Sequence, residues 1–270
     1  MSKSFGKCAL CRKECELSFE HIPPRAAFNA SPAKPVTGDK MMNDDRMPWD
    51  TSGLRYTNQQ QGMGKFSLCK DCNNNTGSWY GNDYIKISQI MHAAFCETIP
   101  ENINAIGIKE IYPLRFIKQI ISMFCSINNI EDERIQSLRD FVLDKTAKGL
   151  DKTKYRLNMY FTKSNLVKYA PLSVVIKLDD NKVQSMAVSE ITAYPLGFIL
   201  IFDPIKDREY DGVDITFFSD CDYDELANIE IPLCIKEMND IFPMHYRSKE
   251  EIKQCVEENK KWSKENDGGQ

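Results

Sequence analysis

The sequence lacks an uninterrupted apolar stretch of the roughly 20 residues that a membrane-spanning helix requires. Its first residues, MSKSFGKCALC, also lack the apolar core of a secretory signal peptide. Residues 96–270 contain no phosphate loop, dinucleotide-binding fingerprint, internal repeat or catalytic triad. We therefore expect a cytoplasmic protein that has no membrane partner, and we expect any chemistry to lie in the first part of the chain.

The sequence also has few histidines and a small net charge. Of the three histidines, His92 falls among apolar residues of an expected helix and His245 follows a proline, so neither is expected to bind a ligand. The net charge is only -4, but residues 1–90 carry 12 Lys and Arg against 9 Asp and Glu, whereas the remainder carries 23 against 30. Because salt screens charge over about 10 Å, an acidic second part does not exclude DNA from a mildly basic first part.

The chain is long enough for more than one unit. A hydrophobic content of 42% in 270 residues indicates a folded protein with its own core. We expect a small zinc-organised unit at residues 1–95 and a larger unit at residues 96–270.

In the first unit, LSFEHI at residues 17–22 predicts a strand that ends at Pro23 and Pro24. A long loop is expected at residues 29–64, followed by a strand at 66–69 and a helix that begins near Asn73.

The second unit is predicted to have an α+β fold with an antiparallel sheet covered by helices on one side. Residues 101–113 are expected to be a link. Helices are expected at residues 114–127, 131–148 and 248–262. Strands are expected at 155–162, 171–178, 182–194, 197–204 and 213–219.

Four of the ten cysteines form two Cys-x-x-Cys pairs, which are typical of a zinc site. The expected ligands are Cys8, Cys11, Cys69 and Cys72. Cys15 could replace Cys8, although its wider spacing from Cys11 fits a zinc knuckle less well. Four thiolates leave no open coordination position, so this zinc is expected to be structural and catalysis must come from other residues.

The polar residues beside the two pairs carry a resemblance. CALC at residues 8–11, LSFEHIPP at 17–24 and LCKDCNNNTG at 68–77 together resemble the HNH endonuclease family, over roughly the first 80 residues. The resemblance implies a two-stranded ribbon packed on a helix, with a metal between them. It also implies hydrolysis of phosphodiester bonds in nucleic acid, with DNA the expected substrate, and suggests a role in prokaryotic or phage defence.

By this resemblance His21 would be the general base that takes a proton from the attacking water. Glu20 and Asn73 would offer oxygen atoms to a catalytic Mg²⁺ or Mn²⁺ ion. Adjacent strand residues point to opposite faces, so Glu20 and His21 can both serve only where the strand ends or is distorted.

One position departs from the family pattern. Family members commonly carry an asparagine nine residues before the metal ligand at the helix start, and this chain has Gly64 there. Asn58 or a glutamine of the 59–61 run could substitute. Asn74 and Asn75 could simply cap the helix. The expected phosphate contacts are Arg25, Lys65 and Lys70.

Two other functions remain open. The first unit could be a noncatalytic zinc module that binds nucleic acid or protein, with Gly64 marking a degraded site. Alternatively, the chain could be a structural protein whose acidic second unit is its main functional part. That second unit could sense a ligand, bind a protein partner or form a homo-oligomer, and its charge makes a DNA-binding surface the least favoured role.

Overall fold

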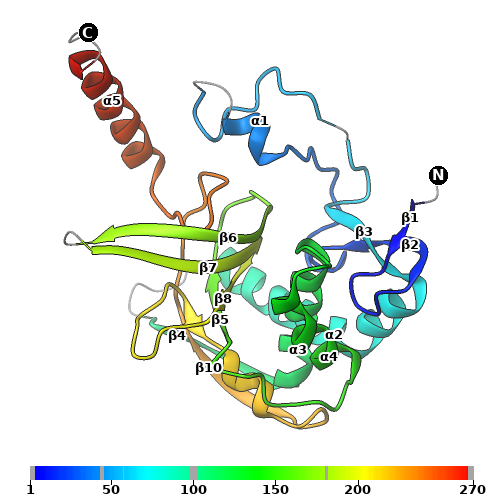
Figure 1. Ribbon diagram of the computed structural model, residues 1–270. Helices are drawn as coiled ribbons and strands as arrows, with labels where there is room; N and C mark the ends of the chain where they lie inside the picture. The colour runs from blue at the N-terminus through cyan, green and yellow to red at the C-terminus, as the bar shows by residue number, and fades with distance from the viewer. Residues whose placement is uncertain (1–3, 43–45, 57, 98–102, 180–181, 267–270) are drawn as a thin grey trace.

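The computed structural model describes residues 4–42, 46–56, 58–97, 103–179 and 182–266. Its described part is a mixed α+β fold, as the sequence predicted, and it contains three antiparallel sheets (Figure 1). None of the described helices is both long and apolar enough to cross a membrane.

The N-terminal sheet has the order β1-β2-β3, with β1 at Ser4–Lys7, β2 at Glu14–His21 and β3 at Gly64–Cys69. The predicted strands at 17–22 and 66–69 are confirmed as parts of β2 and β3. β1 was not predicted, because it is an edge strand held by backbone pairing to β2 and its Phe5 side chain is 74% exposed.

The helix α2, at Lys70–Cys96, follows β3 without a connecting loop. It packs against α3, at Pro113–Ile127, whose side chains are almost all buried, as its apolar sequence predicted. The long loop between β2 and β3 contains the short helix α1, at Gly38–Met42. The predicted helix at 131–148 is shorter in the structure, where a 3-10 turn, η1 at Glu133–Ile135, leads into α4 at Gln136–Leu143.

The largest sheet has the order β6-β7-β8-β5-β9. Its strands are β5 (Tyr155–Phe161), β6 (Lys168–Asp179), β7 (Lys182–Ala193), β8 (Leu196–Phe202) and β9 (Val213–Asp214). The helix α3 contributes to the core on one face of this sheet, and the segment 238–246 packs on the other.

The prediction of a strand at 213–219 is wrong beyond Asp214. The Asp214 carboxylate accepts hydrogen bonds from the backbone N–H and the hydroxyl of Thr216, which turns the chain into the 3-10 helix η2 at Thr216–Asp220. Such a local side-chain bond competes with the ladder of a sheet.

The expected link at 101–113 contains a strand instead. β4, at Ala105–Ile111, pairs with β10, at Ala227–Pro232, which is more than 100 residues away along the chain and was not predicted. The last helix, α5 at Lys249–Asn266, is confirmed and projects away from the sheets (Figure 1).

A continuous hydrophobic core runs from the N-terminal sheet to the large sheet. It includes Cys8, Leu68, Tyr84, Phe116 and Phe198, which lie on both sides of residue 95. The guanidinium of Arg139 on α4, which is 1% exposed, also donates to the carbonyl oxygen of Ala9 at 3.0 Å. The division into units at residues 1–95 and 96–270 therefore stays a prediction, and the two segments are packed together.

A buried ion pair fixes the segment 238–246 on the sheet. The Lys168 ammonium lies 2.9 Å from the carboxylate of Glu190, and both side chains are at most 4% exposed. The Tyr160 hydroxyl and the backbone N–H of Met244 also donate to that carboxylate.

Glu190→Gln is expected to lower the free energy of unfolding by about 3–5 kcal/mol, because it leaves the Lys168 charge buried without a counterion. Urea denaturation measures this effect. As a control, Asp220→Asn removes the partner of Lys152 in a pair that is about half exposed, and should leave the midpoint nearly unchanged. Equal effects of the two substitutions would contradict this role for Glu190.

Candidate metal centre and hydrolytic site

The four predicted zinc ligands form one cluster. The Sγ atoms of Cys8, Cys11, Cys69 and Cys72 all lie within 4.8 Å of one another, and those of Cys11 and Cys69 are 3.9 Å apart. Tetrahedral zinc with Zn–S bonds of about 2.3 Å would place its sulfurs about 3.8 Å apart. The cluster therefore fits a metal such as zinc.

Backbone N–H groups donate hydrogen bonds to two of these sulfurs. The N–H of Cys69 donates to the Cys8 sulfur at 3.2 Å, and the N–H of Cys72 donates to the Cys69 sulfur at 3.4 Å, so that Cys69 is the N-cap of α2. A hydrogen bond from the Cys72 thiol lowers the pKa of Cys8 to about 4, and the same contact raises the pKa of Cys72. The two backbone N–H donors would also stabilise the sulfurs as thiolate ligands of a metal.

Cys15 lies outside the cluster. Its thiol donates to the carbonyl oxygen of Lys13, and Cys8 occupies the fourth position. None of the ten cysteines forms a disulfide bond.

A bulge in β3 sets the faces of the β2–β3 ribbon. Ser18 pairs with Leu68 and Phe19 pairs with Phe66, so Ser67 is the extra residue. Because side chains alternate along a strand, Ser18 and Glu20 share one face of β2 and Phe19 and His21 share the other.

Glu20 is buried on the face toward α3. It is 4% exposed, and its Oε2 accepts hydrogen bonds from the hydroxyls of Ser67, at 2.9 Å, and Ser126. Burial raises the pKa of this carboxyl to about 7, although the two hydroxyls act in the opposite direction.

His21 ends β2 on the opposite face and is half-buried. Its Nε2 lies 3.0 Å from the backbone carbonyl oxygen of Gln61. A carbonyl oxygen can only accept, so Nε2 carries the hydrogen and Nδ1 of the neutral ring has the lone pair. Burial lowers the pKa of His21, and the nearby Arg25 acts in the same direction. No hydrogen bond to Nδ1 comes from the residues that the structure describes, so this atom can accept a proton.

Asn73 lies in the first turns of α2, against β2. Its Nδ2 donates to the Ser18 hydroxyl and to the carbonyl oxygen of Phe19, both at 3.1 Å. The cysteine cluster thus brings the start of α2 against the strand end that carries Glu20 and His21. The exposed Asn74 and Asn75 lie inside α2 and do not cap it, because Cys69 holds that position.

The predicted donors for a catalytic cation fit only in part. A carboxylate and an amide oxygen are the donor types that Mg²⁺ and Mn²⁺ prefer, and Asn73 of α2 contacts Ser18, which shares a face of β2 with Glu20. His21 lies on the opposite face. The carboxylate of Glu20, however, is buried and accepts two serine hydroxyls. Both hydroxyls donate to Oε2, so a cation would have to reach Oε1 in this buried position or displace the serine hydroxyls.

Asn29 was missed by the sequence analysis. It is 7% exposed, donates to the carbonyl oxygens of Pro23 and Met63, and accepts from the N–H of Met63, each at 2.7 Å. It therefore ties the segment after His21 to the segment that holds Gln61. Asn58 and the glutamines at 59–61 were the sequence candidates for orienting His21. Gln61 does contact His21, but through its backbone carbonyl and not through its side chain.

The presence of glycine at position 64 has a steric explanation. It pairs with His21, and a Cβ atom at this position would lie 2.1 Å from the carbonyl oxygen of Glu20 and 2.8 Å from the ring of Phe19. The family asparagine therefore cannot be accommodated in this backbone.

Gly64→Ala is expected to destabilise the protein, and Gly64→Asn more so, without a gain in activity, because the strands must move apart. Gly77→Ala on α2 is the control, since no atom lies within 4 Å of its Cβ. Alanine there should raise the unfolding free energy by up to about 1 kcal/mol. Thermal unfolding measures both. Equal stabilities of Gly64→Ala and wild type would contradict the steric account.

The predicted phosphate contacts lie near this site. Arg25 is exposed and close enough to affect His21, Lys65 pairs with Glu20 across the strands, and Lys70 is exposed at the start of α2. Their role stays a prediction.

Comparisons with protein-family models, with curated proteins and with solved structures found no match to this chain. Any function must therefore be argued from the residues of the site and their geometry.

Proposed function

We propose that this chain is a zinc-stabilised, HNH-type endonuclease that hydrolyses phosphodiester bonds, with DNA as the expected substrate. The observation that supports this best is the environment of His21. Its ring is oriented by the Gln61 carbonyl, its pKa is lowered, and it lies at the strand end that the start of α2 contacts. A neutral imidazole with an accepting nitrogen is suited to general-base catalysis at neutral pH.

In this proposal Nδ1 of His21 takes the proton from the water that attacks the phosphorus. The Gln61 carbonyl holds the ring, and Asn29 keeps the two loop segments together. Glu20 and Asn73 are the residues that would hold Mg²⁺ or Mn²⁺, and this ion would stabilise negative charge on the phosphate and the leaving oxygen. Arg25, Lys65 and Lys70 would contact neighbouring phosphates. A cytoplasmic role in phage defence is consistent with this activity.

A second candidate is a noncatalytic zinc module that binds nucleic acid or protein. The burial of Glu20 favours it, because a carboxylate satisfied by Ser67 and Ser126 serves as a structural contact. The tight fit at Gly64 is compatible with either candidate.

Incubation of the zinc-loaded protein with supercoiled plasmid separates the two candidates. The nuclease proposal expects nicked and linear products with Mg²⁺ or Mn²⁺, and none when the free divalent ion is omitted. A labelled single-stranded RNA tests the other substrate class. Failure to cleave DNA or RNA with either ion, by a folded protein that retains zinc, would favour the noncatalytic module.

A further inference from the structure

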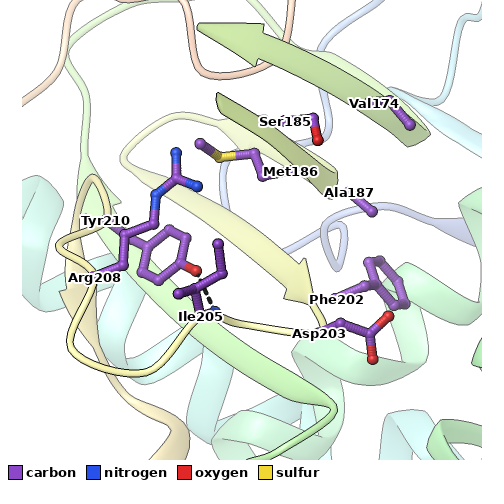
Figure 2. Close-up of a pocket in the computed structure, with 9 residues that line it drawn as sticks. All are labelled: Val174, Ser185, Met186, Ala187, Phe202, Asp203, Ile205, Arg208 and Tyr210. Carbon is purple, nitrogen blue, oxygen red and sulfur yellow. Dashed lines mark hydrogen bonds between the residues drawn. The ribbon is translucent and has the colours of Figure 1, made fainter. Parts of the chain in front are cut away.

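A hollow of about 250 Å³ lies beside the large sheet, where β7 extends beyond the end of β8 (Figure 2). β8 ends at Phe202, opposite Ala187, whereas β7 begins at Lys182. Ser185 and Met186 therefore pair with β6 on one side and, among the described strands, have no neighbour on the other. Backbone groups on that side of β7 face the hollow without a strand partner.

An arginine extends across this hollow. Figure 2 shows Arg208 reaching from the loop after β8 toward Met186. Its described contact is with the ring of Tyr210, 5.4 Å from the ring centroid. Arg156 also lies over this ring but has a carboxylate partner, Asp214, at 3.3 Å. No carboxylate pairs with Arg208 among the described residues.

The loop that carries Arg208 is held in place. The hydroxyl of Tyr210 accepts a hydrogen bond from the backbone N–H of Ile205 at 2.7 Å, which closes the loop (Figure 2). The guanidinium is thus presented on an anchored turn, which reduces the entropy lost when an anion binds.

The other walls are largely apolar and partly open to solvent, but they also include the exposed side chains of Ser185 and Asp203. Figure 2 shows the Asp203 carboxylate at the end of the hollow away from Arg208, so an anion would bind at the Arg208 end. Val174 is 67% exposed and Ile205 is 57% exposed, and Ala187 and Phe202 also line the hollow. Its volume lies below the roughly 300–1,000 Å³ of sites that enclose drug-sized ligands. An occupant is therefore small, or enters only with its end, and combines an apolar side chain with an anionic group.

We propose that this hollow binds the C-terminal residues of an extended peptide. The peptide backbone would pair with the free edge of β7 where β8 has ended, a small apolar side chain would lie between Val174 and Ile205, and the terminal carboxylate would bind Arg208. Strand addition and carboxylate capture are established modes of peptide recognition. This inference does not depend on the nuclease proposal.

Fluorescence anisotropy with the full-length, zinc-loaded protein tests it. The probe is a fluorescein-labelled hexapeptide that ends in Val-Ile-Val with a free carboxylate. Its C-terminal amide is expected to bind at least about tenfold more weakly, because the hydrogen bond to a charged group is lost. Arg208→Gln should weaken binding of the acid by a similar factor, and Lys206→Gln, on the same loop, should not.

Isovalerate distinguishes a peptide from a small apolar acid. It has the carboxylate and the branched chain but no backbone to pair with β7, so it should compete at least about tenfold more weakly than the unlabelled peptide acid. Equal binding of acid and amide, equal effects of Arg208→Gln and Lys206→Gln, isovalerate as good as the peptide, or no binding of the peptide would each overturn the inference.

Discussion

Removal of the metal is expected to unfold the N-terminal sheet and to lower the melting temperature of the whole chain. The cysteine cluster joins two segments that are about 60 residues apart, and Cys8 and Cys72 belong to the continuous hydrophobic core. Structural zinc binds zinc-finger peptides with about 10–16 kcal/mol, which is comparable to the entire stability of a domain, about 5–15 kcal/mol.

Cys69→Ser tests this expectation with a change of one atom. The variant should retain less than one zinc per chain by elemental analysis and should melt well below wild type. Cys96→Ser is the matched control, because Cys96 is exposed and lies outside the cluster. If Cys69→Ser binds a full equivalent of zinc and melts like the control, the cluster is not a structural metal site.

His21→Ala is expected to reduce plasmid cleavage by about 10²–10⁴-fold, the usual contribution of a general base. The wild-type rate should fall as the pH drops, because protonation of Nδ1 removes the acceptor. Burial lowers the pKa of His21 below its usual 6.5, so this fall is expected below pH 6.5. The residual activity of His21→Ala should not show this fall in rate at low pH.

The lowered pKa of His21 has a consequence for stability. A group whose pKa is depressed in the folded state contributes stability above its unfolded pKa, and this contribution is lost as the pH falls through the folded value.

His92→Gln is the control for the cleavage experiment with His21→Ala, because it also removes an imidazole, and His92 contacts Tyr194 and Phe28 at a different place. Loss of activity in both variants, or in neither, would contradict the assignment of His21.

Short-range patterns predicted much of the fold. The two Cys-x-x-Cys pairs predicted the cysteine cluster, because ligand spacing is a local property. The apolar runs of α3 and β8 predicted buried elements, because few other structures can hide them. β4 and β10 were missed because they are stabilised by pairing with each other across more than 100 residues, which leaves no local signature.

The candidate site was predictable only in part. The sequence placed Glu20, His21 and Asn73 near one another through the expected cluster. It could not show that Ser126, 106 residues away on α3, donates to Glu20 and helps bury it. Asn29 was hidden for a similar reason, because its three hydrogen bonds join parts of a long loop that has no periodicity.

The central proposal is that the cysteine cluster brings Asn73 against the face of β2 that carries Glu20, so that these two residues can serve as ligands for a second cation. Binding of Mn²⁺ to the zinc-loaded protein, followed by electron paramagnetic resonance, tests it most directly. The account predicts one Mn²⁺ per chain that is lost in Asn73→Ala and kept in His21→Ala. The affinity should rise as the pH increases through about 7, because the Glu20 carboxyl, whose pKa is about 7, loses its proton there. Absence of bound Mn²⁺ at any pH, or equal binding by wild type and Asn73→Ala, would contradict it.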